Sequence, residues 1–304
     1  MLSSKSGTQS CVASTLCKRV RVAVAFAWLT CAGLLAAIVT VGVIGREQAK
    51  LGLDWYHVYS YDVDGTNLPR QPPPGANNDN IRGNVLEIGP GLGESLLQLS
   101  RKKLGSRYVA LEPNPYLHEA LAENAKKAGF GSIHYDLLTC PNAAELNTGG
   151  ETPVLSIVNG TLDGMVPQYV RDHAPYDTVV SSLVLCSVDN PQATLDSILE
   201  LLVPGGRFVF IEHVRHTDEM DLSVDASVYA SGSFNIKAWG WMQELLTPIW
   251  SLVGGNCHLN RRTAQLLDDM KGWSSVRYTT LRLSGSMIDK LGPFIYGVAT
   301  KALP

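Results

Sequence analysis

Length, composition and charge exclude several classes of protein. The chain has 304 residues, 45% of them hydrophobic, so it can bury a large core and is neither disordered nor a disulfide-rich miniprotein. Residues 1–46 contain five basic and no acidic residues, which leaves 20 basic and 28 acidic residues in 47–304. This acidic body argues against a nucleic-acid partner. The six cysteines form no CxxC pair and no zinc-like spacing, so we expect no metal site, no disulfide framework and a reducing compartment.

The N-terminal region contains an uncharged segment of 24 residues, 22–45. As a helix it would span roughly 36 Å, which is enough to cross a bilayer. It is also longer than the apolar part of a cleaved signal peptide. We therefore expect a retained transmembrane anchor in contact with membrane lipid. The preceding basic, Ser-rich segment, 1–21, resembles a mitochondrial presequence because it lacks acids.

The remaining chain divides into a linker region and one domain. Residues 62–80 combine Pro, Gly, Asn and Asp with few apolar residues, a composition typical of linkers. We assign 46–80 to a juxtamembrane segment with this linker, and 81–304 to a single folded domain.

Apolar runs alternate with helical patterns along this domain. The first five predicted strands are 85–88, 108–111, 154–158, 178–185 and 207–214, and the helices between them are 95–103, 116–127, 164–171 and 192–202. A further helix is predicted at 236–253, followed by strands at 276–283 and 294–300. The alternation predicts a doubly wound α/β fold with a seven-strand, mainly parallel sheet. The polar stretch 131–152 is predicted to be a surface insertion.

A glycine-rich turn follows the first strand, with Gly89, Gly91 and Gly93 in the sequence VLEIGPGLGES. Glycines at such a turn let the backbone approach a ligand closely. Glu112 ends the second strand 19 residues after Gly93, where an acid can accept both hydroxyls of an adenosine ribose. Glu94 stands where a third glycine of GxGxxG would lie, so a nicotinamide site is the second choice.

Several motifs in succession resemble those of class I S-adenosylmethionine-dependent methyltransferases: VLEIGPGLG, LEPNP, YDTVVSSLVLCSV and LLVPGGRFVFIEHV. VLCSV, EHV, the Trp-rich helix running to Trp250 and GGNCHLNR are more closely similar to the membrane-anchored methyltransferase-like protein seven family, the alkyl thiol S-methyltransferases. The resemblance covers about residues 84–302. It implies a Rossmann-like methyltransferase sheet, S-adenosylmethionine as cofactor and a small hydrophobic acceptor.

The resemblance also implies which residues form the site. The candidate cofactor-binding residues are Glu87, Gly89, Pro90, Gly91, Gly93, Glu112, Pro113, Thr161, Leu162 and Leu183. His213, at the end of the fifth strand, is the candidate base, since a histidine pKa of about 6.5 suits removal of a thiol proton of pKa about 8.5. A packed histidine is the alternative. Trp239, Trp241 and Trp250 are candidates for an acceptor wall, for core packing or for membrane contact.

Three functions stay open. The first is a membrane-anchored methyltransferase acting on a small hydrophobic acceptor such as a thiol, and the second is a quinone or lipid methyltransferase of a mitochondrial membrane. The third is a non-catalytic, membrane-tethered scaffold, against which the intact Gly89, Gly91 and Glu112 argue. We expect a mitochondrial location or the cytosolic face of the endoplasmic reticulum. Residues 159–161 form a glycosylation acceptor, NGT, in the expected adenine-binding stretch, where a glycan would block the cofactor.

Overall fold

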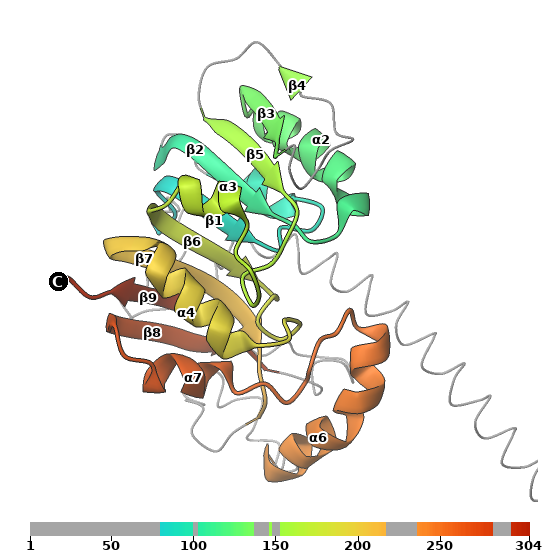
Figure 1. The fold of residues 1–304 in the computed structure, drawn as a ribbon. Helices are drawn as coiled ribbons and strands as arrows, with labels where there is room; N and C mark the ends of the chain where they lie inside the picture. Colours follow the sequence, from blue (N-terminus) through green and yellow to red (C-terminus); the bar gives the residue numbers. More distant parts are fainter. Residues whose placement is uncertain (1–79, 100–102, 137–145, 148–152, 217–235, 282–292) are drawn as a thin grey trace, which may run out of the picture. The chain divides into compact units, whose positions relative to one another are not determined.

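The computed structural model describes residues 80–99, 103–136, 146–147, 153–216, 236–281 and 293–304 (Figure 1). The predicted anchor at 22–45, the segment before it and the linker up to residue 79 lie outside these ranges. Within them, no helix combines the length and the apolar character that a membrane span requires.

A nine-stranded sheet forms the centre of the described part, in the order β4-β3-β5-β2-β1-β6-β7-β9-β8. The pairings from β3 through β7 are parallel, whereas β9 runs antiparallel to both β7 and β8, and β4 antiparallel to β3. The strands are β1 (Gly83–Ile88), β2 (Leu104–Leu111), β3 (Ser132–Tyr135), β4 (Leu146–Asn147), β5 (Val154–Val158), β6 (Tyr176–Ser182), β7 (Leu202–His213), β8 (Trp273–Leu281) and β9 (Phe294–Lys301).

The predicted number of seven strands is wrong, although all seven predicted strands form. The two additional strands, β3 and β4, come from the stretch that we predicted to be a surface insertion. β3 adds to the edge of β5, with Ser132 opposite Val154, and Ile133 is fully buried there. β3 has only four residues and one of them is deeply buried, so its sequence is too short to show a clear period-two pattern. Its formation therefore depends on pairing with the edge of β5.

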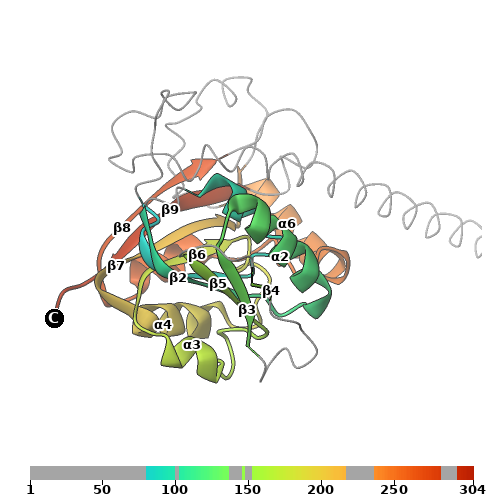
Figure 2. The ribbon, with the colours of Figure 1, turned by 90° about the horizontal axis from the view of Figure 1, so that it is seen from above.

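Helices cover both faces of the sheet (Figure 2). η1 and α2 pack on one face, while α3, α4 and α7 pack on the other. The described helices are η1 (Glu94–Gln98), η3 (Pro115–Leu117), α2 (His118–Ala128), α3 (Gln168–Asp172), α4 (Pro191–Leu201), α6 (Ile236–Val253) and α7 (Thr263–Asp269). This confirms the expected α/β class with a doubly wound sheet.

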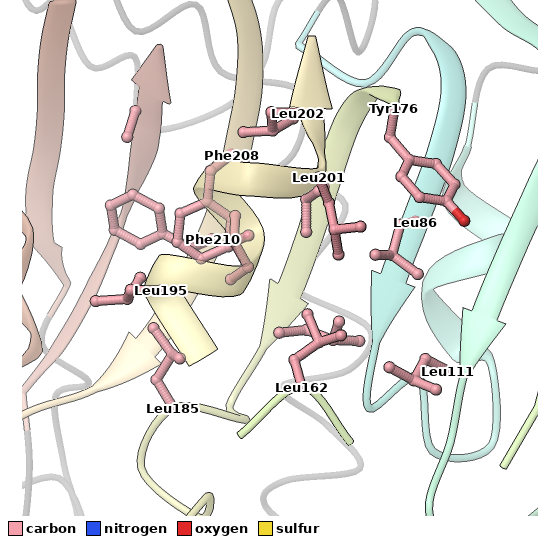
Figure 3. Packing of buried hydrophobic residues seen from close by; sticks show 14 of the residues in the cluster. Leu86, Leu111, Leu162, Tyr176, Leu185, Leu195, Leu201, Leu202, Phe208 and Phe210 are labelled. Carbon is pink, nitrogen blue, oxygen red and sulfur yellow. The ribbon is translucent and has the colours of Figure 1, made fainter. Parts of the chain in front are cut away.

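Each face of the sheet has its own hydrophobic core. On the α4 side, Leu86, Phe208 and Phe210 from the strands pack against Leu195 of α4 (Figure 3). The opposite core joins Val85 and Tyr108 to helix residues such as Leu121. Because strand residues alternate between the two faces, consecutive side chains of β1 enter different cores.

Local signals explain where two of these helices begin and end. The Asn190 side chain accepts a hydrogen bond from the backbone N–H of Ala193 and caps α4, and Pro191 occupies its first turn. Of the helix predicted at 95–103, residues 100–102 lie outside the described ranges; the described residues before them form the 3-10 helix Glu94–Gln98, which ends where the backbone of Leu99 is extended (φ −75°, ψ 139°).

Candidate functional site

A cavity of about 400 Å³ lies at the carboxyl ends of β1, β2, β5 and β6. Ligands bind at this edge of open α/β sheets, and the volume lies within the range of small-molecule sites. Six of the predicted cofactor residues line it: Gly89, Glu112, Pro113, Thr161, Leu162 and Leu183. The structure thus brings together, in one cavity, residues from four separate strand ends.

The glycine turn after β1 has a left-handed backbone that favours glycine, and two of its positions show different reasons for it. A Cβ atom at Gly93 (φ +75°) would lie 2.5 Å from Leu121 Cδ1, so this glycine permits close packing against α2. A Cβ at Gly91 (φ +59°) would meet no atom within 4 Å. The space beside Gly91 is therefore open, as a close backbone approach to a ligand requires.

Glu112 connects this turn to the end of β2. Its Oε2 accepts a hydrogen bond from the Gly91 N–H, and its Oε1 accepts one from the Asn114 N–H, both at 2.8 Å. The side chain is only 4% exposed. Each carboxylate oxygen can accept a second hydrogen bond, so Glu112 has one further position on each oxygen for a pair of vicinal hydroxyls.

These observations meet the requirements of an adenosine-containing cofactor. The carboxylate of Glu112 would hold the ribose, and the open space at Gly91 admits the atoms attached to it. Leu162 and Val188 also line the cavity. Apolar side chains of this kind would provide the apolar contact that an adenine ring needs. The described residues contain no group of three or more His, Cys, Asp or Glu that could hold a metal ion.

The loop after β5 is held against the loop after β6. Asp163, in the loop after β5, accepts a hydrogen bond from the Asp189 N–H at 2.8 Å. Burial opposes its ionisation, but hydrogen bonds from Thr161 and from backbone N–H groups outweigh burial and lower the pKa of Asp163. An ionised Asp163 therefore fixes this wall of the cavity.

Glu212 positions the loop after β6 from beneath. It is fully buried and accepts hydrogen bonds from the Ser181 hydroxyl and from the backbone N–H groups of Val184 and Leu185. Burial raises the pKa of Glu212 to about 7, against the opposing effect of these hydrogen bonds. Leu183, in the same turn, has a positive φ of 58°, which is rare for a non-glycine residue and often marks a functional site.

Four predicted cofactor residues are not among those that line the cavity: Glu87, Pro90, Gly91 and Gly93. Glu87 is fully buried and accepts hydrogen bonds from Ser95 Oγ and Tyr108 Oη, both at 2.6 Å. Burial raises the pKa of Glu87, against the lowering effect of its hydrogen bonds from Ser95 and Tyr108. Pro90 contributes its carbonyl to the turn by accepting the Gly93 N–H.

The predicted base, His213, is buried at the end of β7 and does not line the cavity. Its Nδ1 lies 3.4 Å from the Sγ of Cys257. Cys257 follows Gly255, which does line the cavity. His213 therefore lies close to a loop that lines the cavity. Its Nδ1 faces Cys257, so Nε2 is the ring nitrogen that does not face this thiol.

Sequence reasoning missed several lining residues. These residues are Asp163, Val184, Ser187, Val188, Asp189, Thr194 and Gly255. Val184, Ser187 and Val188 belong to the VLCSV motif, which was noted for its resemblance but not assigned to the site. Gly255 carries no local signal, because only tertiary packing brings the loop after α6 to the cavity.

Comparisons with known proteins agree with this geometry. A family model described as a methyltransferase domain matches residues 66–264, more than half of the chain. The thiol S-methyltransferase TMT1A of Homo sapiens is 27% identical over 222 residues, which is 71% of this chain and 70% of that protein. The thiol S-methyltransferase TMT1B of Rattus norvegicus is 33% identical over 131 residues, which is 41% of this chain and 43% of that protein. The matched part is thus less than half of the rat relative.

Comparison with solved structures gives matches of lower sequence identity. An O-methyltransferase family protein from Burkholderia thailandensis has a TM-score of 0.47 at 12% identity, covering 86% of this chain and 60% of that one. The N-methyltransferase NodS from Bradyrhizobium japonicum, solved with S-adenosyl-L-homocysteine, has a TM-score of 0.41 at 14% identity, covering 72% of this chain and 78% of that one.

Proposed function

The chain belongs to the S-adenosylmethionine-dependent methyltransferases, and we propose that its acceptor is a small hydrophobic thiol and that it acts at a membrane surface. The cavity that brings Gly89 and Glu112 together is the observation that carries the cofactor part of this proposal. The thiol acceptor is supported by the similarity to the human and rat thiol S-methyltransferases.

The protein's own residues would position the reactants. S-adenosylmethionine supplies a methyl group that is already activated on a sulfonium. Glu112 would hold the ribose hydroxyls, while its bonds to Gly91 and Asn114 keep the turn in place. The chain must then align a nucleophile with the methyl carbon at about 3–3.5 Å.

A thiol acceptor must lose its proton to become a strong nucleophile. His213 is our candidate to accept that proton. Its Nδ1 is engaged by Cys257, so Nε2 is the nitrogen we assign to the acceptor side. This arrangement, a base oriented by a second group, is common in catalytic sites.

A substrate screen with isotopically labelled S-adenosylmethionine tests the acceptor. Full-length protein in detergent would be incubated with hydrophobic thiols, quinones and lipid precursors, and the labelled products identified by mass spectrometry. We expect label in thioethers, and His213→Gln should lower the rate more at pH 6.5 than at pH 9, where thiols ionise without help. Label in quinones or lipids alone would contradict the thiol assignment and favour the mitochondrial alternative.

The membrane part of the proposal is supported by an unusual distribution of side chains on α6. Apolar residues lie on its exposed side, where Trp241, Leu245, Ile249 and Leu252 are 76%, 71%, 61% and 84% exposed. Their spacing of three to four residues puts them on one helix face.

Two polar residues of α6, Gln243 and Thr247, lie on its inner side, whereas Glu244 is exposed and pairs with Arg215. Gln243 is fully buried, accepts a hydrogen bond from the His216 N–H and donates one to the Val214 carbonyl. Thr247 is also buried. A helix that exposes Trp, Leu and Ile side chains on one face is suited to the interface of a bilayer. The uncharged segment 22–45 would hold the same chain at that bilayer.

Two measurements test the membrane proposal. Carbonate extraction should leave the full-length protein in the membrane pellet, because a spanning segment resists extraction; release into the supernatant would contradict the anchor. In vesicles containing brominated phosphatidylcholine, Trp241→Phe should remove more of the quenched fluorescence than Trp273→Phe, a matched change on β8. Equal losses would contradict the contact of α6 with lipid.

A further inference from the structure

Two free thiols, Cys186 and Cys257, lie close to the cofactor cavity, and Cys257 also contacts the proposed base His213. Cys186 is buried on the loop after β6, and Cys257 is partly exposed on the loop after α6. Hydrogen bonds on both sides of them join the two loops. His258 N–H donates to the Cys186 carbonyl at 2.8 Å, and Asn256 Nδ2 donates to the Ser187 carbonyl at 2.7 Å. The backbone therefore fixes the two cysteines as neighbours.

The surroundings give the two thiols different chemical character. A hydrogen bond with Cys186, opposed by burial and aided by His213 at 3.4 Å, lowers the pKa of Cys257 to about 4. The same contact and burial raise the pKa of Cys186. The thiolate is the nucleophilic form of cysteine, so the more exposed member is the reactive one and the buried member remains a thiol.

Both cysteines lie within two residues of the residues that line the cavity. Ser187, next to Cys186, lines one side, and Gly255, two residues before Cys257, lines another. A disulfide would bring the two sulfur atoms to about 2.05 Å, closer than any non-bonded contact. The walls would be drawn together and the cavity narrowed.

We propose that Cys186 and Cys257 are a redox-sensitive pair that a hydroperoxide oxidises to a disulfide, and that this bond weakens cofactor binding. The Cys257 thiolate attacks the peroxide, whose O–O bond breaks, giving a sulfenic acid and hydroxide or alkoxide that takes up a proton. The Cys186 sulfur then attacks the sulfenic sulfur, losing its proton and releasing water. Overall, two thiols and one hydroperoxide give one disulfide, one water and one water or alcohol.

Peptide mapping tests the chemistry independently of the acceptor. Reduced full-length protein in detergent would be treated with hydrogen peroxide, alkylated and digested. We expect a Cys186–Cys257 cross-linked peptide that disappears with dithiothreitol. Cys257→Ser should abolish it, Cys186→Ser should leave a sulfenic acid at Cys257 that dimedone traps, and Cys140→Ser, the control, should retain the cross-link. Absence of the cross-link in the oxidised wild type would overturn the proposal.

The effect on the site is measured by calorimetry with S-adenosylmethionine on reduced and oxidised protein. This readout depends on the cofactor assignment but not on the thiol acceptor. We expect oxidation to weaken binding about fivefold or more, equivalent to about 1 kcal/mol, and dithiothreitol to restore it. The Cys186→Ser variant, checked for folding by its melting temperature, should lose less affinity on oxidation. Binding that is unchanged in cross-linked wild type would contradict the regulatory role, while failure of the reduced protein to bind would count against the cofactor site instead.

Discussion

Replacing Glu112 with alanine should weaken S-adenosylmethionine binding at least tenfold. Each carboxylate oxygen already accepts one backbone N–H at 2.8 Å, which leaves one acceptor position on each oxygen for a ribose hydroxyl. Hydrogen bonds to a charged group contribute roughly 1.5–3 kcal/mol each. Tenfold corresponds to about 1.4 kcal/mol, so losing either bond is enough. The turn also loses its bond from Glu112 to Gly91, which would add to the effect.

The assay is isothermal titration calorimetry on full-length protein in detergent, with the melting temperature measured in parallel. Glu123→Ala is the matched control, because Glu123 carries the same charge on the exposed side of α2. It should leave the dissociation constant unchanged. Unchanged affinity in a folded Glu112→Ala protein would refute the ribose assignment.

Three further predictions follow from the same structure. Alanine at Gly91 (φ +59°) or Gly93 (φ +75°) carries the strain of a left-handed backbone. Gly91→Ala should weaken cofactor binding and destabilise only by this strain, because its Cβ enters open space, whereas Gly93→Ala adds a 2.5 Å approach to Leu121 and should lower the melting temperature more. The reverse order of melting temperatures would contradict the assignment. Burial raises the pKa of Glu212 to about 7 from 4.5, so its contribution to stability is present below about pH 4.5 and is lost as pH rises through about 7. Replacing Glu212 with glutamine should therefore flatten the fall in melting temperature from pH 5 to 8. The full pH-dependent change in the free energy of unfolding from this group is about 3 kcal/mol. Parallel pH profiles of the wild type and the variant would contradict this prediction. Asn159 should carry no glycan, since Gly160 and Thr161 beside it line the cavity; a glycosidase-sensitive mobility shift that Asn159→Gln abolishes would place the body in the secretory lumen.

Local sequence signals predicted the parts of the site that depend on one strand end at a time. The glycine turn and Glu112 are recognisable because a strand, a turn and an acid follow one another at short spacing, and the structure joins them through the bond from Gly91 to Glu112. Leu162 and Leu183 were assigned through the resemblance, and they line the same cavity. The roles of all these residues in binding stay predictions.

The features that the sequence did not indicate depend on long-range packing. β3 forms because its backbone pairs with the edge of β5. Gly255 reaches the cavity, with Cys257 close behind it, because hydrogen bonds join the loop after α6 to the loop after β6, 69 and 73 residues away in the chain. Glu87 shows the opposite case: a motif suggested contact with the cofactor, whereas Ser95 and Tyr108 bind its carboxylate in the core.

A structure of the protein with bound S-adenosylhomocysteine tests the central claim most directly. The account predicts that the ligand occupies the cavity at the carboxyl ends of β1, β2, β5 and β6. Both ribose hydroxyls should lie within hydrogen-bonding distance of Glu112, and the part of the ligand attached to the ribose should pass close to Gly91. A ligand bound elsewhere, or one whose ribose does not contact Glu112, would contradict the assignment of this site.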